Sequence, residues 1–336
     1  MFSKLPELFD RNFATGYFLP VASFIAATLE IANKFGLLPV VQAASQTDIL
    51  LGTTLIGLIS WIGGICLLAA NRDILRLAEG YGRFNPANMF KWRERRRYRK
   101  LREELSRLDE ECLPYISNQQ ELPSKLRLKR NSLMQEAVER FPDEEHWLLP
   151  TPLGNAIRAF EIYPLVMYGL ESIQGWNRLL AVVPEAFREL VDNAKAHVDF
   201  WVNLWLLSLV FTLEYGAVAL YTRKIEALWI PFLSLGVALI AFSRATSAAV
   251  GWGNWVKATF DTFLPELYDK LGFSCPPIME QERALWRKFS QAIIYREADL
   301  VPNRSGLRLE RKQNAITALS SRRRIAKKSR PGQRQV

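Results

Sequence analysis

An uncharged run of 23 residues, from Ile49 to Asn71, constrains the fold of this chain more than any other feature. The run is rich in Leu, Ile and Gly and ends at Arg72 and Asp73. A soluble amphipathic helix keeps one polar face, whereas about 20 consecutive apolar residues are enough to cross the hydrocarbon core of a membrane. The run therefore predicts a transmembrane helix.

Three further stretches have the same character. The first lies between Arg11 and Glu30, where 18 consecutive residues carry no charge, and Pro20 is expected to kink it. A cleaved signal peptide is the alternative, but Glu30 and Lys34 would make its polar end too long. The last two carry aromatic residues at their ends, as expected at membrane interfaces. We expect spans at about 13–29, 49–70, 200–221 and 227–243. The third is expected to continue a helix of 37 residues that starts after Pro184, since no helix breaker follows until Thr222 apart from Gly216.

The distribution of basic residues predicts the orientation of these spans. Residues 71–198 contain 21 Lys and Arg, whereas the loop between the first two spans has only Lys34 and the loop between the last two has Arg223 and Lys224. Basic loops stay on the cytosolic side of a membrane. We expect a multi-pass protein of the plasma membrane, or of the inner membrane if the protein is bacterial, with both termini in the cytosol.

The fold class that follows is an all-α integral membrane protein with four transmembrane helices and a helical cytosolic domain. The net charge of +10 is concentrated in the tail, where residues 302–336 hold eleven Lys or Arg and one acid. Such a basic, weakly apolar tail is expected to be disordered. The expected regions are a transmembrane hairpin (1–70), a cytosolic helical region (71–198), a second transmembrane hairpin (199–243), helices that pack on the bundle (244–301) and the tail (302–336).

A helical hairpin is expected at 92–141 within the cytosolic region. Its first helix, from Trp92 to Cys112, has apolar residues spaced by three and four, so that one face seeks a partner. Its second helix runs from Lys125 to Phe141, and the coiled pair packs either within one chain or between chains. The apolar positions are Tyr98, Leu101, Leu105, Leu108 and Cys112 in the first helix, and Leu126, Leu133, Met134, Ala137, Val138 and Phe141 in the second.

Reactive motifs are not readable in the chain. Its three cysteines have no paired spacing and it has only two histidines, so neither a disulfide framework, a thiolate zinc site nor a histidine-rich metal centre is indicated. The sequence shows no phosphate loop, nucleophile elbow or metalloprotease motif. We therefore expect no catalytic residue, cofactor or metal ligand, and a protein that is not an enzyme.

Charged residues near the outer ends of the spans form a candidate membrane polar site. Glu214 lies about 14 residues above the inner edge of its span, or about 21 Å along a helix. A carboxylate at that depth lines a conduit, pairs with a cation, or reaches outward to the interface. The candidate residues are Glu30, Lys34, Glu214, Arg223 and Lys224.

Two basic clusters are candidates for contact with anionic lipid headgroups, because a bilayer is the nearest polyanion. A merely solvated helix face is the alternative for the first cluster, and nucleic acid is a less favoured partner for both. The candidates are Arg95, Arg96, Arg97, Arg99 and Lys100 in the helical region, and Arg322, Arg323, Arg324, Lys327 and Lys328 in the tail.

The segment L-P-T-P-L-G-N, from Leu149 to Asn155, precedes an amphipathic helix at 156–172, which is expected to break near Pro164, and a later long span. In this it resembles a type of uncharacterised bacterial multi-pass membrane protein. The resemblance implies a bacterial inner membrane and no particular activity.

Two functions remain open from the sequence. The first is a membrane-anchored interaction or scaffold protein that presents its helical domain and basic tail to lipid or protein partners. The alternative is an oligomeric ion channel, or channel-like effector, that is gated by the cytosolic region and requires several copies of the chain.

Overall fold

The computed structural model describes residues 10–35, 49–221, 223, 228–273 and 276–297. All regular structure in these residues is helical, which confirms the predicted all-α class. The chain divides into two compact units. The first unit contains Met1–Glu161 and Glu185–Lys257, and the second contains Ile162–Pro184 and Ala258–Val336.

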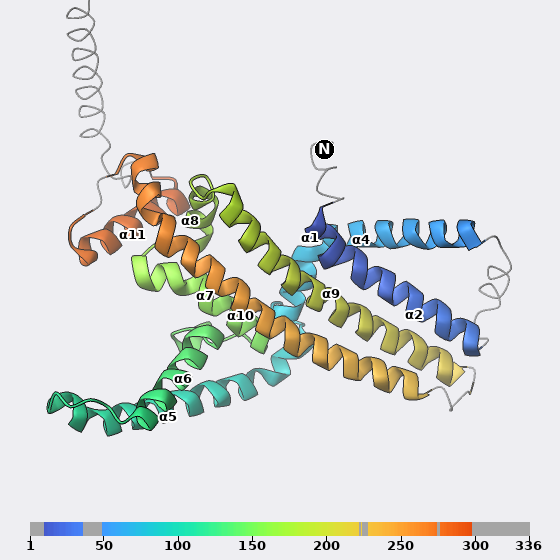
Figure 1. The fold of residues 1–336 in the computed structure, drawn as a ribbon, viewed down its shortest axis with the longest axis horizontal. Coiled ribbons are helices and arrows are strands. Elements are labelled where there is room, and N and C mark those ends of the chain that lie inside the picture. Colours follow the sequence, from blue (N-terminus) through green and yellow to red (C-terminus); the bar gives the residue numbers. More distant parts are fainter. Residues whose placement is uncertain (1–9, 36–48, 222, 224–227, 274–275, 298–336) are drawn as a thin grey trace, which may run out of the picture. The chain divides into compact units, whose positions relative to one another are not determined.

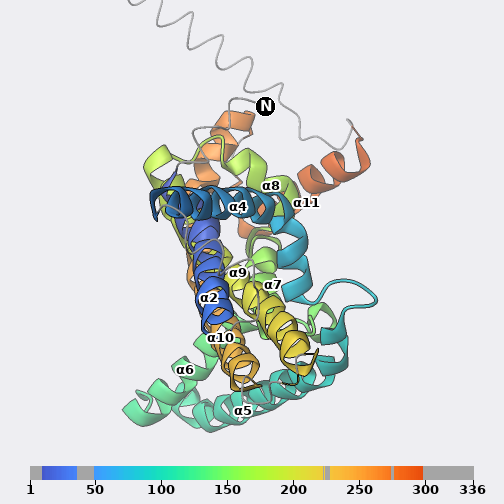
Figure 2. The ribbon, with the colours of Figure 1, turned by 90° about the vertical axis from the view of Figure 1, so that its right-hand side faces the viewer.

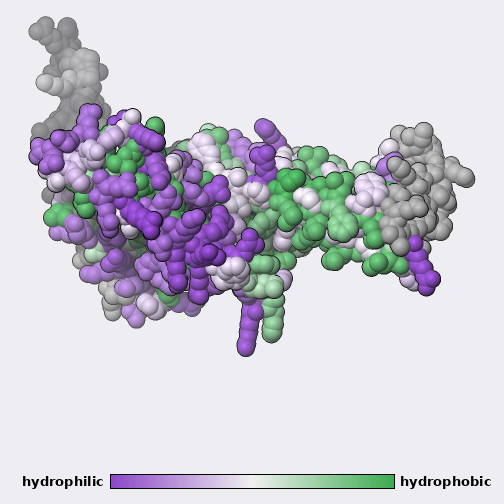
Figure 3. All heavy atoms as spheres, turned by 90° about the horizontal axis from the view of Figure 1, so that it is seen from below, coloured by the Kyte–Doolittle hydropathy of each residue, from purple (hydrophilic) through white to green (hydrophobic). Residues whose placement is uncertain are grey.

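Four helices in the described residues are long and apolar enough to cross a membrane, as the sequence predicts. Figure 1 shows α2, α9 and α10 running side by side, and Figure 3 shows hydrophobic residues gathered over their ends. Exposed apolar surface of this extent suits a lipid environment better than water. The four are Arg11–Ala32, which comprises α1 (Arg11–Phe13), the π-helical turn η3 (Ala14–Phe18) and most of α2 (Leu19–Phe35), then α4 (Ile49–Glu79), α9 (Glu185–Tyr221) and α10 (Trp229–Leu271).

The first of these helices begins with a capping residue and soon contains a π-helical turn, which is wider than a regular α-helical turn. The Asp10 carboxylate accepts a hydrogen bond from the Arg11 backbone N–H at 2.7 Å. In η3 the N–H of Leu19 donates to the carbonyl of Ala14, five residues back. Pro20 follows directly, and because proline has no N–H and its ring crowds the carbonyl four residues earlier, the preceding turn cannot form its normal α-helical bond. This places the irregularity one turn before Pro20.

Two glycines bring α4 close to the start of the chain. A Cβ on Gly63 would lie 2.7 Å from the Val21 side chain, and one on Gly64 would lie 3.0 Å from Phe13. Small residues allow this close approach of helices. Toward residue 49, α4 diverges from α2, and its side chains there, such as Leu55 and Ile59, are exposed (Figures 1 and 2).

The α9 helix has the bounds expected from the sequence, because it begins directly after Pro184 and continues for 37 residues. It packs on α10 through an aromatic pair, Trp205 and Phe242, with ring centroids 5.4 Å apart. The hydroxyl of Ser234 donates to the Ser208 carbonyl at 2.8 Å across the same pair of helices. These contacts fix α9 against α10 in the first unit.

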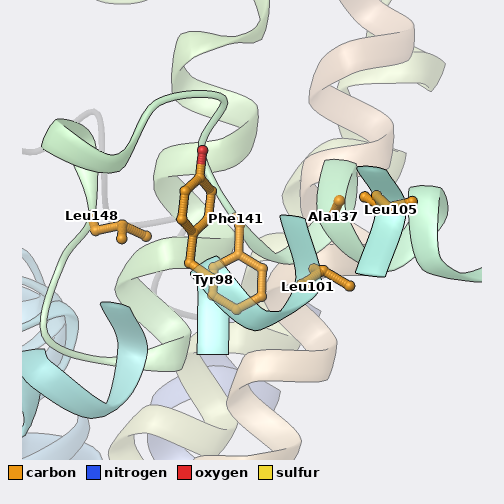
Figure 4. Packing of buried hydrophobic residues seen from close by; sticks show 6 residues of the cluster. All are labelled: Tyr98, Leu101, Leu105, Ala137, Phe141 and Leu148. Atoms are coloured by element: carbon orange, nitrogen blue, oxygen red, sulfur yellow. The ribbon is translucent and has the colours of Figure 1, made fainter. Parts of the chain in front are cut away.

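The expected hairpin forms within one chain as α5 (Lys91–Ser117) and α6 (Ser124–Arg140), hereafter the arm. Tyr98, Leu101 and Leu105 of α5 pack with Ala137 and Phe141 (Figure 4). The tyrosine hydroxyl also donates to the Asp143 carbonyl at 2.7 Å. The five apolar positions predicted for α5 are all buried.

Two details of the arm differ from the expectation. The first helix does not end before Pro114 but continues to Ser117. The proline lacks the N–H that would bond to the carbonyl four residues earlier, and the helix ends within one turn of it. On α6, Met134 and Val138 are exposed, because this helix buries a narrower stripe centred on Ala137.

The segment Leu149–Asn155 holds the end of α4, and we refer to it as the clasp. The Thr151 hydroxyl donates to the Glu79 carbonyl at 2.9 Å and accepts from the Gly154 N–H at 2.9 Å. It therefore caps α7 (Pro152–Tyr168) and satisfies a terminal carbonyl of α4 at once. Asn155 is fully buried and accepts from the Leu149 N–H at 2.7 Å.

The second unit is built around aromatic residues of α10 and α11 (Met279–Tyr295), together with α8 (Ser172–Leu179). Trp286 of α11 is fully buried and lies 4.7 Å from the Tyr268 ring, measured between centroids. The α7 helix was expected to break near Pro164, but it continues to Tyr168 and ends where Gly169 adopts a positive φ of 76°. The reversal at Gly169, not the proline, ends the helix.

Candidate functional site

The exposed side of α5 carries the basic residues predicted to meet anionic headgroups. Arg95, Arg96, Arg99 and Lys100 lie together with Trp92 around one shallow hollow, and we refer to this surface as the basic face. Arg97, predicted as part of the same set, lines a different hollow on another side of the helix. The sequence run is therefore divided between two faces of α5.

Asn85 positions the start of α5 against the end of α4. Its side-chain amide donates to the carbonyls of Leu77 at 2.8 Å and Tyr81 at 3.1 Å, and its oxygen accepts from the Ala87 N–H at 2.9 Å. The Ala87 bond caps the short helix η4 (Pro86–Phe90) that leads into α5. A single buried side chain thus fixes the basic face close to the apolar helix α4.

Only part of the positive charge of the basic face is neutralised by ion pairs. Arg99 donates to Glu145 at 2.7 Å, and its guanidinium holds the pKa of that carboxyl below its usual range. Within the described residues, no ion pair involves Arg95, Arg96 or Lys100. Three cations of the basic face are therefore available to an external anion.

Large apolar side chains are exposed in the basic face and in the segment that precedes α5. Phe84 is 94% exposed, Met89 68% and Trp92 60%. Exposed aromatic residues beside cations are typical of surfaces that enter the headgroup region of a membrane. The sequence analysis missed this apolar component, although Phe84 and Met89 stand between α4 and the arm and Trp92 lies in the first turn of α5.

The residues of the predicted membrane polar site are not brought together by their described side chains. Glu30 is exposed on α2, Glu214 is exposed on α9, and Arg223 is exposed in the turn after it. No ion pair joins these three to any other described residue. The Lys34 side chain, Lys224 and the tail residues Arg322, Arg323, Arg324, Lys327 and Lys328 lie outside the described part of the chain.

A different polar cluster is buried between α9 and the start of the chain. The Tyr17 hydroxyl and the Lys195 ammonium each donate to Asp199 Oδ2 at 2.7 Å. Asn203, one turn further along α9, donates from its amide to the Gly16 carbonyl at 2.8 Å. Asp199 is only 3% exposed and Asn203 is fully buried.

This cluster has a direct relation to Pro20. In a regular α-helix the Gly16 carbonyl would accept from the N–H of residue 20, which proline lacks. Asn203 supplies the missing donor from a neighbouring helix. The remaining acceptors, Asp199 Oδ1 and Asn203 Oδ1, are buried and have no hydrogen-bond partner within the described residues.

The sequence analysis gave these residues no role, because Lys195 and Asp199 lie just before the span expected at 200–221. A signal was present in the spacing: Lys195, Asp199 and Asn203 recur every four residues on one face of α9. A polar stripe of this kind predicts a buried helix contact.

The clasp is accompanied by a second polar network, whose side chains are partly exposed. Arg158 donates to the Tyr81 hydroxyl and pairs with Glu161 at 3.2 Å. Burial raises the pKa of Glu161 and of Tyr81 above their usual values. The network joins the chain after α4 to α7 and serves to hold the two in place.

The described residues contain no group of three histidine, cysteine or acidic side chains that could hold a metal ion. The exposed chemistry of the first unit is instead cationic and aromatic. Comparison of the chain with protein-family models, curated proteins and solved structures gives no match.

Proposed function

We propose that this protein is a membrane-anchored interaction protein that presents its helical arm to an anionic lipid surface. In this proposal the four apolar helices cross the bilayer, both termini lie in the cytosol, and the arm stands on the cytosolic side. Support for the orientation comes from the 21 Lys and Arg of residues 71–198, which contrast with the few in the opposite loops.

The observation that carries the proposal is the composition of the basic face and its surroundings. Arg95, Arg96 and Lys100 make no described ion pair, and Trp92 stands exposed among them. A nucleic-acid surface would use the cations, but it would leave Phe84 and Met89 in water. An anionic bilayer uses both, since the cations meet phosphates and the apolar side chains enter the interface.

The test is binding of anionic vesicles by the full chain. The protein is reconstituted in phosphatidylcholine nanodiscs and floated with vesicles that contain phosphatidylglycerol, or phosphatidylcholine alone. Each basic residue near an anionic surface contributes roughly 1 kcal/mol. Replacing Arg95, Arg96 and Lys100 by Gln is therefore expected to lower binding about a hundredfold.

A matched pair of variants removes two charges each, Arg95 and Arg96 from the basic face or Lys125 and Arg127 from α6, all replaced by Gln; the two α6 residues are exposed and do not line the hollow of the basic face. The α6 variant tests whether position matters as well as charge. It should retain most of the binding. Equal losses in the two variants would show that only net charge matters, and equal binding to neutral vesicles would refute the lipid assignment. Deleting residues 302–336 measures the contribution of the tail separately, with folding expected to be intact.

A further inference from the structure

A hollow of about 560 Å³ lies within the first unit, between α9, α10, the end of α4 and the start of α5. This volume is within the range of small-molecule sites, which is roughly 300–1,000 Å³. It is not the hollow of the basic face, because it opens on the other side of α5 and shares none of Arg95, Arg96, Arg99 or Lys100.

One wall of the hollow is apolar and belongs to two helices that are apolar enough to cross a membrane. Leu206 and Leu209 line it from α9, and Leu239 and Phe242 line it from α10. Trp205 stands in the same wall and packs on Phe242. Tryptophan is enriched where the hydrocarbon region meets the headgroups.

The opposite wall is polar and carries a net positive charge. Arg93, Glu94 and Arg97 line it from α5. The buried Glu94 carboxylate already accepts from Arg97 at 3.2 Å and from the Asn155 amide at 3.0 Å. No ion pair involving Arg93 is present among the described residues, so two arginines against one acid leave one excess cation.

The other polar side chains of this wall are committed to the protein. Asn85 bonds to Leu77, Tyr81 and Ala87, and the Thr151 hydroxyl bonds to Glu79 and Gly154. One end of the hollow therefore holds the Arg93 guanidinium, which has no ion pair within the described residues, and, one helical turn away, Arg97, which shares its charge with Glu94. The other end is an apolar surface.

We infer that this hollow binds a single phospholipid with an anionic headgroup. The phosphate lies against Arg93 and Arg97, since guanidinium groups bind phosphate oxygens through paired N–H donors. The first part of the acyl chains lies along Leu206, Leu209 and Leu239. A phospholipid has this same division between an anionic and an apolar end, whereas a free anion would leave the leucine wall unused.

This inference goes beyond the proposed function, because it concerns one lipid held by one chain rather than the contact of the basic face with a bilayer. An experiment can refute either of these two proposals without refuting the other. The arm could meet vesicles through the basic face with the hollow empty, and a lipid could occupy the hollow in a protein that binds no vesicle.

Native mass spectrometry of the delipidated full chain in a mild detergent tests the site, with phosphatidylglycerol, phosphatidylcholine or inorganic phosphate added in turn. We expect one phosphatidylglycerol to bind at least tenfold more tightly than phosphatidylcholine, with no competition from inorganic phosphate. Equal binding of both lipids, or displacement by inorganic phosphate, overturns the inference. A mass corresponding to two chains without lipid would assign the hollow to a second copy and overturns it equally.

Paired variants locate the lipid. Arg93→Gln is expected to weaken phosphatidylglycerol binding about tenfold, through the loss of one charge-assisted contact. Arg127→Gln, at an exposed position of α6 that lines neither hollow, leaves it unchanged. Leu209→Trp, which fills the apolar wall, should abolish binding; Leu213→Trp, one turn further and 74% exposed, should not. Thermal melts establish that each variant is folded. Equal effects of either pair would show non-specific lipid around the helices and overturn the inference.

Discussion

The bond between Asn203 and the Gly16 carbonyl gives a quantitative prediction about how the start of the chain is held. Replacing Asn203 by Leu keeps the number and branching of the side-chain heavy atoms but removes the donor that takes the place of the missing Pro20 N–H. A buried acceptor left unsatisfied costs about 1–3 kcal/mol, and hydrogen bonds between transmembrane helices average about 0.6 kcal/mol with a maximum near 1.7. We therefore expect a loss of about 1 kcal/mol in the free energy of unfolding.

The Pro20→Ala variant tests whether Asn203 compensates for the missing N–H of Pro20. Alanine supplies a backbone N–H that can donate to the Gly16 carbonyl within its own helix, so this carbonyl no longer depends on Asn203 for a donor. In that background Asn203→Leu should cost close to nothing, which gives a coupling free energy of about 1 kcal/mol. Asn193→Leu, at a partly exposed position on α9, serves as the control and should show no dependence on residue 20.

Reversible unfolding in mixed micelles, followed by tryptophan fluorescence, measures all of these variants. If Asn203→Leu costs the same in both backgrounds, within about 0.3 kcal/mol, Asn203 does not compensate for Pro20 and the reasoning is wrong.

Two further predictions follow from close contacts and from burial. Gly154→Ala would place a Cβ 2.3 Å from the Glu79 carbonyl oxygen and should destabilise the protein by about 2–3 kcal/mol in the same assay, whereas Gly216→Ala, with nothing within 4 Å of its Cβ, should be neutral or stabilising. In the second unit, Tyr163 and Tyr168 donate to Asp261 at 2.9 and 2.6 Å, and burial and these bonds raise the pKa of Tyr163 to about 12 and that of Tyr168 further. Because both values lie above the ordinary tyrosine pKa, near 10, the stabilisation is complete below pH about 10 and is lost as the pH rises through about 12. Absorbance titration should show both pKa values falling in Asp261→Asn; unchanged values would contradict the assignment.

Uncharged runs and the spacing of apolar residues predicted most of the fold. The uncharged runs and the clean start after Pro184 depend on residues close in sequence, so the four apolar helices and the bounds of α9 could be read directly. The helix ends expected at Pro114 and Pro164 were wrong, because α5 and α7 both continue past these prolines. A proline near a helix end or within a well-packed helix need not end it. Such outcomes depend on tertiary packing.

The site residues were harder to predict for the same reason. The basic run on α5 was visible, but its division between two faces depends on which side of the helix meets α9 and α10. The clasp was recognised as a segment without a role; its contacts join Thr151 to Glu79, 72 residues earlier. A pattern of residues close in sequence cannot indicate a contact between residues so far apart along the chain.

In the proposed topology, the four apolar helices cross the membrane and the arm lies in the cytosol. Cysteine accessibility tests it most directly, with Cys66, Cys112 and Cys275 replaced by Ala and one cysteine returned at Ser132 of the arm or at Arg223 after α9, both exposed positions. With a membrane-impermeant maleimide, we predict labelling of Arg223→Cys in intact cells and of Ser132→Cys only after permeabilisation. Labelling of Ser132→Cys in intact cells, or of both positions only after permeabilisation, would contradict the account.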